Sequence, residues 1–193
     1  MEFDQVIKNR RSIRKFHQQA VETEKITAIL DCARLCQSAK NRQPWRFMVL
    51  TEDRKNRVAD IMLNLFEQND VELHGYMNSS RNSANIIKNA PVLILVFIPK
   101  DEEWIQSDLL SVGAAIEHIC LKAVNEGLGS VWIADTVYTR EGICEELGRT
   151  DDLLVSGIAV GYADEQPSPR PRKTLFFGSS RSSLRTLLLE DED

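Results

Sequence analysis

The feature of this 193-residue sequence that most constrains its fold is the uninterrupted apolar run Val92–Ile98, which follows Pro91. The run is far too short to cross a bilayer, which takes about 20 apolar residues in a helix. A strand with one face in water alternates apolar and polar residues, whereas a strand covered on both faces carries a continuous apolar run. The run therefore predicts a central strand that is buried on both of its faces.

The remaining sequence patterns supply the neighbours of this strand. Apolar residues recur at helical spacing in several segments, and the longest of these ends before Gly127, a natural helix terminator. Thr23 is a plausible N-cap for the second helix. The predicted helices cover residues 2–9, 23–36, 54–68, 83–89, 105–126 and 139–147, and the predicted strands cover residues 47–51, 92–98, 130–134 and 153–160. Because this order is not a strict strand–helix alternation, it predicts a mixed sheet with helices on both faces.

Charge and cysteine content limit the classes of partner. The formal net charge is −5, whereas nucleic-acid binding needs a basic face that neutralises phosphates. Four cysteines without a C-x-x-C pair, and three histidines without metal-ligand spacing, predict buried free thiols and no metal site. No signal peptide or membrane span is recognised. We therefore expect a cytoplasmic protein that binds neither nucleic acid nor membranes.

Two short stretches near the N-terminus hold the candidate binding residues. Residues 10–16 combine four cations with the hydroxyl of Ser12, and guanidinium groups match phosphate oxygens. Residues 38–45 place a hydroxyl and two carboxamides beside Pro44 and Trp45, and carboxamides match the polar edge of a flat ring. A third cluster, Arg170–Lys173, is stiffened by prolines. Taken singly, each stretch also fits an ordinary solvated loop, so local chemistry leaves both interpretations open.

Four motifs together make the sequence resemble the FMN-dependent nitroreductase family. They read N-R-R-S-I-R-K-F at 9–16, S-A-K-N-R-Q-P-W at 38–45, G-L-G-S-V-W-I at 127–133 and V-G-Y-A-D-E-Q-P-S-P-R-P-R-K at 160–173. The resemblance implies an α+β fold of three layers (α/β/α) with a mixed, mainly antiparallel sheet. It further implies one FMN-binding domain over residues 1–175, and a tail over 176–193 that wraps the partner in an intertwined homodimer.

The resemblance also implies roles for individual residues. The arginine stretch would hold the FMN phosphate and ribityl chain, the second stretch would lie along the isoalloxazine ring, and the strand after Gly129 would pass its reactive edge. The implied cofactor-binding residues are Arg10, Arg11, Ser12, Arg14, Ser38, Asn41, Gln43, Trp132, Ile133, Ala134, Arg172 and Lys173. The implied reaction moves hydride from NADH or NADPH through flavin N5 to an electron-poor acceptor, such as a nitroaromatic or a quinone, in a ping-pong cycle. It needs no side-chain nucleophile, so no catalytic residue is assigned.

The sequence departs from the family pattern at two places. Gln37-Ser38-Ala39 replaces a Pro-Ser-Gly segment, which leaves the backbone path there open. Asp135 follows the flavin-edge strand where many members have a small or apolar residue. Since an unpaired buried charge is costly, we expect its carboxylate to turn away from the ring rather than tune it. Two alternatives remain: another flavin chemistry on the same fold, such as dehydrogenation or dehalogenation, and a flavin-binding module without turnover.

Overall fold

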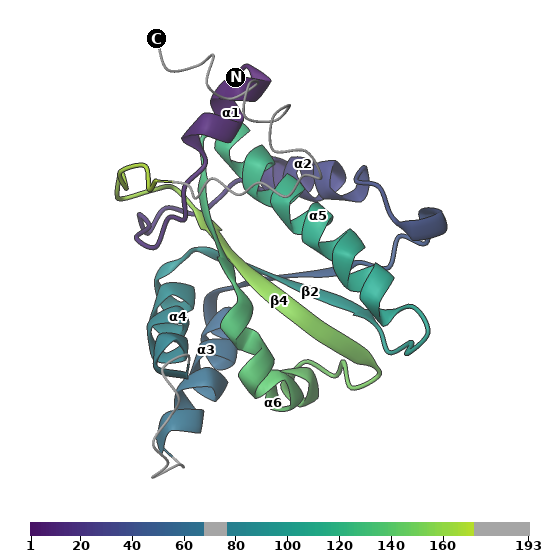
Figure 1. Ribbon diagram of the computed structural model, residues 1–193. Helices are drawn as coiled ribbons and strands as arrows, with labels where there is room; N and C mark the ends of the chain where they lie inside the picture. Colours follow the sequence, from purple (N-terminus) through teal and green to yellow (C-terminus); the bar gives the residue numbers. More distant parts are fainter. Residues whose placement is uncertain (68–76, 172–193) are drawn as a thin grey trace, which may run out of the picture.

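The computed structural model describes residues 1–67 and 77–171 (Figure 1). At its centre is a four-stranded antiparallel sheet with the strand order β1-β2-β4-β3. The strands are β1 (Arg46–Thr51), β2 (Val92–Pro99), β3 (Gly129–Ile133) and β4 (Asp152–Gly161). The apolar run forms most of β2, and β2 lies between β1 and β4, as predicted. Among the described residues, the parallel component of the sheet is one isolated bridge between Ser12 and Ser130.

Helices lie on both sides of this sheet. They are α1 (Phe3–Asn9), α2 (Thr23–Arg34), α3 (Glu52–Glu67), α4 (Met77–Asn89), α5 (Ile105–Asn125) and α6 (Arg140–Glu146), with the 3₁₀ helices η1 (Ala39–Asn41) and η2 (Ala134–Thr139). The N-cap prediction for Thr23 is wrong, because Glu22 occupies that position and makes no side-chain cap. The helix predicted over residues 83–89 is too short, since α4 begins at Met77. Residues 68–76 lie outside the described residues.

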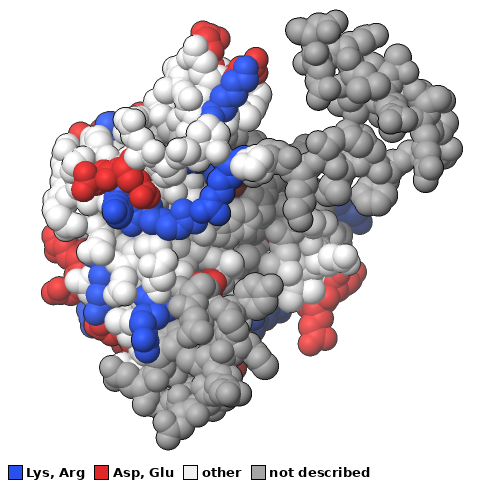
Figure 2. Space-filling view, turned by 60° about the vertical axis from the view of Figure 1, so that its left-hand side comes forward, with Lys and Arg blue, Asp and Glu red and all other residues white. Residues whose placement is uncertain are grey.

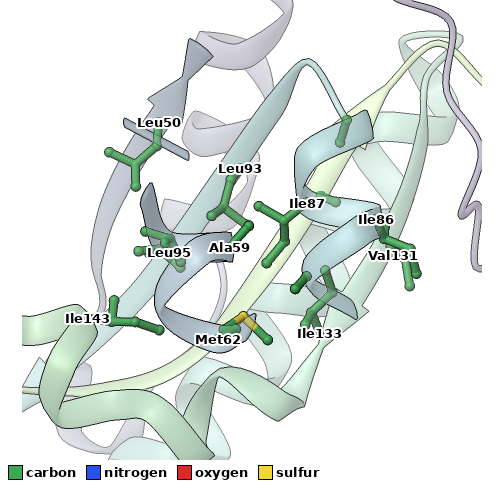
Figure 3. Packing of buried hydrophobic residues seen from close by; sticks show 14 of the residues in the cluster. Leu50, Ala59, Met62, Ile86, Ile87, Leu93, Leu95, Val131, Ile133 and Ile143 are labelled. Carbon is green, nitrogen blue, oxygen red and sulfur yellow. The ribbon is translucent and has the colours of Figure 1, made fainter. Parts of the chain in front are cut away.

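The side chains of β2 alternate between two separate hydrophobic clusters. Leu93, Leu95 and Phe97 join the cluster formed with α3, α4 and α6, part of which Figure 3 shows. Ile94 and Val96, with their neighbours, join the cluster formed with α2 and α5. Full burial of an aliphatic side chain of this size contributes about 1.5–3 kcal/mol. The continuous apolar run is therefore explained by two cores that share one strand.

A tight turn joins α5 to β3. Leu128 N–H donates to the carbonyl of Ala123 at 2.8 Å, and Gly127 N–H donates to that of Val124 at 3.0 Å. This pair of bonds is a Schellman motif, which requires a left-handed residue, and Gly127 has φ +76°. The predicted helix end is confirmed, and the turn sends β3 back along the sheet.

The chain after α1 docks along the end of the sheet formed by β3 and β4. Ile13 N–H donates to the carbonyl of Ser130 at 2.9 Å, and Asp164 N–H donates to that of Lys15 at 2.9 Å. Ile13 is buried against Gly129, where an added Cβ would come within 2.7 Å of Ile13 Cγ1. Because only a glycine leaves this space, the sequence after α1 can lie directly on β3.

Candidate functional site

The first candidate site is built by the arginine stretch and the chain after β4. Ile13 and Phe16 are its buried anchors. Polar residues on either side of Ile13 line an open hollow of about 450 Å³. Its lining residues are Ile7, Lys8, Arg10, Arg11, Ser12, Arg14, Pro167, Ser168, Pro169 and Arg170. The structure therefore brings the predicted residues Arg10, Arg11, Ser12 and Arg14 to one surface.

The hollow is strongly basic on a chain that is acidic as a whole. Arg10 has one acidic partner, since its Nε lies 3.5 Å from Glu117 Oε1. Arg11 Nη1 donates to the carbonyls of Lys8 and Arg10, at 2.7 Å each, and these bonds leave its positive charge uncompensated. Figure 2 shows basic side chains gathered in a band across this face, with acidic side chains beside them. Such a surface suits a small polyvalent anion, for which guanidinium groups supply charge-assisted hydrogen bonds.

Glu165 holds the stretch from its other side, a role that the sequence prediction missed. Its Oε1 accepts hydrogen bonds from the backbone N–H groups of Arg14 at 2.5 Å and Lys15 at 3.3 Å. Because the carboxylate is occupied by backbone donors, the arginine side chains remain directed to the hollow. A signal was present in the sequence: Glu165 lies in the same motif as the basic cluster after β4.

The second candidate site is the turn between α2 and β1. Three of its residues, none of them glycine, have left-handed backbones: Lys40 (φ 49°), Asn41 (φ 56°) and Gln43 (φ 49°). Each such residue costs roughly 1–2 kcal/mol, and strain of this kind persists only where the surroundings impose it. Ser38 Oγ accepts a hydrogen bond from Gln43 N–H at 3.0 Å and closes the turn. The backbone path that the sequence left open is therefore a closed, strained turn.

This turn exposes both predicted carboxamides. Asn41 and Gln43 are exposed, and Gln43 Nε2 donates to Asn41 Oδ1 at 3.2 Å. Beneath them, Arg42 Nε and Nη2 bind both carboxylate oxygens of Asp108, at 3.2 and 3.3 Å. Hydrogen bonding to Asp108 raises the pKa of the Arg42 guanidinium above its usual range, so the group stays charged. The sequence prediction did not include Arg42, although an aspartate at a core position of the helix 105–126 was a signal for a buried cation partner.

The third candidate site is the end of β3. Trp132 is half exposed and its Nε1 donates to Ser156 Oγ at 2.6 Å, which fixes the indole against β4. Ile133 is buried in the core, and Ala134 begins η2 at the surface. Asp135 Oδ2 accepts a hydrogen bond from Ser83 Oγ of α4 at 2.7 Å. The carboxylate is therefore engaged by α4.

The three sites are not all adjacent within one chain. The arginine stretch adjoins β3 through the bridge between Ser12 and Ser130. The turn at 38–43 is held near the start of α5, where Ala39 N–H donates to Ser111 Oγ at 3.4 Å. Figure 1 shows this turn and the segment after α1 at opposite sides of the molecule. Arg172 and Lys173 lie outside the described residues.

The cysteines and carboxylates of the described residues form no metal site. All four cysteines are free, and burial raises the pKa of the Cys120 thiol to about 11. Within the described part of the chain, no helix combines the length and the apolar content needed to cross a membrane.

Solved structures with this fold include flavoproteins. An FMN complex of a nitroreductase-like protein from Desulfovibrio desulfuricans superposes with a TM-score of 0.74 at 26% identity, covering 99% of this chain and 97% of that one. A BluB-like flavoprotein from Clostridium difficile gives a TM-score of 0.73 at 26% identity, covering 92% and 100%. The three-layer α+β fold expected from the sequence is confirmed.

Sequence relatives agree with the structural ones. A "Putative NADH dehydrogenase/NAD(P)H nitroreductase" from Methanothermobacter thermautotrophicus is 33% identical, over 88% of this chain and 82% of its own length. An iodotyrosine deiodinase from Thermotoga neapolitana is 28% identical over 86% and 90%. The sequence profile of the nitroreductase family matches residues 7–162, which include the arginine stretch, the strained turn and all four strands. The chain belongs to the nitroreductase family.

Proposed function

We propose that the protein is an NAD(P)H-dependent FMN oxidoreductase that reduces an electron-poor small molecule such as a nitroaromatic or a quinone. The observation that carries the proposal is the basic hollow, in which a family motif folds into a cluster of cations beside the edge of β3. Bound FMN would supply the hydride chemistry, accepting from NADH or NADPH and donating to the acceptor in a ping-pong cycle. The protein's own residues bind the cofactor, orient it and tune it.

The residues fit the phosphate end of FMN. The hollow offers the guanidinium groups of Arg10, Arg11 and Arg14, with the hydroxyl of Ser12 as a neutral donor. Arg170, in the chain after β4, adds a fourth guanidinium to the lining of the hollow. We propose that Arg172 and Lys173, which follow it in the sequence, contribute further charge. Phosphate binding by arginine forks adds geometric selectivity to charge, which suits a cofactor that must be held in one orientation.

The residues also fit the ring end. Asn41 and Gln43 present a paired donor and acceptor to solvent, which matches the alternating pattern of an imide edge. At the end of β3 we assign Trp132, Ile133 and Ala134 to the reactive edge of the ring. Backbone N–H groups near Ala134 are suitably placed in the chain to stabilise negative charge that develops there.

We further propose that the complete site requires a homodimer. The turn at 38–43 and the arginine stretch are on opposite sides of one chain (Figure 1), so Ser38, Asn41 and Gln43 would reach the ring from a second copy. Large apolar side chains are exposed on the same side of the fold as α5 or near its ends: Phe3, Ile7, Leu35, Leu109 and Leu110. A partner subunit would cover this exposed apolar surface. Free cysteines without a disulfide suit the reducing cytoplasm, which we propose as the compartment.

The test begins with purified protein and added FMN. We expect a yellow protein with a flavin spectrum, anaerobic bleaching by NADH or NADPH, and reoxidation by an electron-poor acceptor. Arg10→Ala is expected to release FMN, whereas Arg34→Ala, an exposed arginine on α2 that pairs with Asp31, is not. A protein that stays colourless with excess FMN would refute the proposal, and FMN bound by a strict monomer would refute the dimer. Bound FMN that neither nicotinamide reduces would instead favour a module without turnover.

Reductive dehalogenation is a second candidate function. It is favoured by the similarity to the iodotyrosine deiodinase, which covers 86% of this chain. The two functions are separated by giving the reduced protein an iodotyrosine and a nitroaromatic in parallel. Iodide release that outpaces nitroaromatic reduction would favour dehalogenation, and the reverse would favour the nitroreductase activity.

A further inference from the structure

We infer that Arg42 is a positioning residue for the flavin ring, an inference that rests on the proposed FMN function. Arg42 is locked to the start of α5 by Asp101, Trp104 and Asp108, and these four residues are called here the Arg42 clamp. Through the clamp, Arg42 holds the strained turn in the one conformation that presents the carboxamides of Asn41 and Gln43. Arg42 itself does not touch the cofactor.

The clamp is anchored in a rigid part of the fold. The Asp108 side chain is 1% exposed, and its two oxygens take the Nε and Nη2 of Arg42 as a fork. Asp101 Oδ2 takes a second bond from Nη2 at 3.1 Å. The guanidinium carbon lies 4.4 Å from the centroid of the Trp104 ring, a cation–π contact. A planar guanidinium that bonds two carboxylates and stacks on a ring has little freedom to rotate.

Arg42 lies within the segment of the turn whose backbone is strained. The two residues before Arg42 and the residue after it have left-handed backbones, while Arg42 itself has φ −66°. Conformations of this kind relax unless neighbouring contacts over-determine them. The turn is also held by the Ser38 Oγ bond to Gln43 N–H, by the Ala39 N–H bond to Ser111, and by a cation–π contact of 5.1 Å between Lys40 Nζ and the Trp104 ring. The clamp alone among these contacts includes ion pairs with carboxylates, and Arg42 lies directly between the two carboxamide residues.

Arg42 and its two neighbours in the turn have different roles: Arg42 holds the backbone, and Asn41 and Gln43 present their carboxamides. Arg42 is turned inward to α5, whereas its neighbours Asn41 and Gln43 are exposed. Gln43 Nε2 also lies 3.5 Å from the carbonyl of Asn41, so the carboxamide pair depends on the path of the backbone between them. If the clamp opens, the two carboxamides lose their common orientation. Small displacements of binding groups weaken recognition strongly.

The test removes the clamp without leaving a buried charge. Arg42→Met keeps the length of the side chain but leaves the buried carboxylate of Asp108 without its Arg42 partner. We therefore combine it with Asp108→Asn. The double variant is expected to melt close to the wild type yet to bind FMN at least about tenfold more weakly. The FMN affinity of Arg42→Lys is expected to lie between those of the wild type and the double variant, because an ammonium group cannot make the two-pronged bond to Asp108. As a matched control, Arg57→Met with Glu146→Gln removes an exposed ion pair of 3.3 Å and should leave FMN affinity unchanged.

A second readout does not depend on FMN. Lys40 is exposed within the turn, so cleavage after it by a lysine-specific protease reports whether the turn has relaxed. We expect faster cleavage at this site in the Arg42→Met/Asp108→Asn variant than in the wild type or the control pair. Wild-type affinity and wild-type cleavage in the double variant would overturn the inference and leave the FMN function standing. A wild-type chain that binds no FMN would overturn the proposed function and the cofactor part of the inference, and the protease result would then decide the locking of the turn alone.

Discussion

The arginine stretch and the turn at 38–43 are held in place by different forces. The arginine stretch is a piece of extended chain fixed by backbone hydrogen bonds to Ser130 and by the buried side chains of Ile13 and Phe16. The turn is fixed by the Arg42 clamp against a strained backbone. Backbone and apolar anchors leave the charged side chains available to a ligand. In the Arg42 clamp, by contrast, the guanidinium is already bonded to Asp101 and Asp108. The comparison assigns anion binding to the first region and orientation of neutral polar groups to the second.

The largest effect is expected from removing the apolar anchor of the arginine stretch. Ile13→Ala deletes a buried side chain from the core and should destabilise the protein by about 2–5 kcal/mol. FMN binding should fall at the same time, because the stretch loses its attachment to β3. Urea unfolding and an FMN titration measure the two effects. Ile13→Val is the control, with an expected loss of about 0.5–1.5 kcal/mol, and equal losses for both variants would contradict the apolar anchoring.

A smaller effect is expected when the stretch is pushed away from the sheet. In Gly129→Ala the new Cβ would stand 2.7 Å from Ile13 Cγ1, and the Cβ of Ile13 itself is 2.8 Å away. Overpacking of this kind costs about 1–3 kcal/mol. FMN affinity should drop while protease cleavage at Lys40 stays unchanged, because the turn is anchored elsewhere. A variant that kept its FMN affinity would show that close contact with β3 is not required.

Glu165 gives a milder test of the same region. Glu165→Ala removes the acceptor shared by the N–H groups of Arg14 and Lys15, for an expected loss of about 1–2 kcal/mol. Glu165→Gln retains an acceptor and should keep most of the stability and most of the FMN affinity. Chemical denaturation of the three proteins side by side measures the difference. If Gln behaves like Ala, the charge of Glu165 matters more than its hydrogen bonds.

The smallest effect is a loss of stability at alkaline pH. Burial raises the pKa of Cys120 to about 11. The unfolded chain therefore releases its thiol proton at lower pH than the folded chain, and stability falls as pH rises from about 9 to about 11. At pH 10 the ionisation of this thiol lowers the free energy of unfolding by about 1 kcal/mol. Cys120→Ala should flatten the decline in urea-unfolding curves recorded between pH 8 and pH 10.5, and an unchanged slope would remove Cys120 as its source.

Much of the fold was predictable because it depends on local periodicity and burial. The run Val92–Ile98 is apolar at every position, and the structure divides its side chains between two cores. Gly127 was predictable as a helix end because few residues adopt its backbone conformation. The N-cap at Thr23 was mispredicted because Glu22 takes that position without a side-chain cap, and capping preference is only a weak local signal.

The composition of the candidate site was predictable, but its attachments were not. Arg10, Arg11, Ser12 and Arg14 were identified from residue type and motif, and they line one hollow. Glu165 and the Arg42 clamp join residues that are 151 and 66 positions apart, and no local pattern relates such distant residues. A charge in the sequence carries no information about its partner until the chain has folded.

The sequence by itself determined the two-sided central strand, the helices that cover it, the family and the chemical character of the binding stretches. The strand, the helices and the chemical character follow from residue type and near-neighbour spacing, whereas the family was recognised from the resemblance of four motifs. Only the tertiary structure decided that the arginine stretch lies on β3 and that Arg42 faces a buried carboxylate. These outcomes depend on which distant surfaces meet in the folded core, and that is settled by packing of the whole chain rather than by any segment of it.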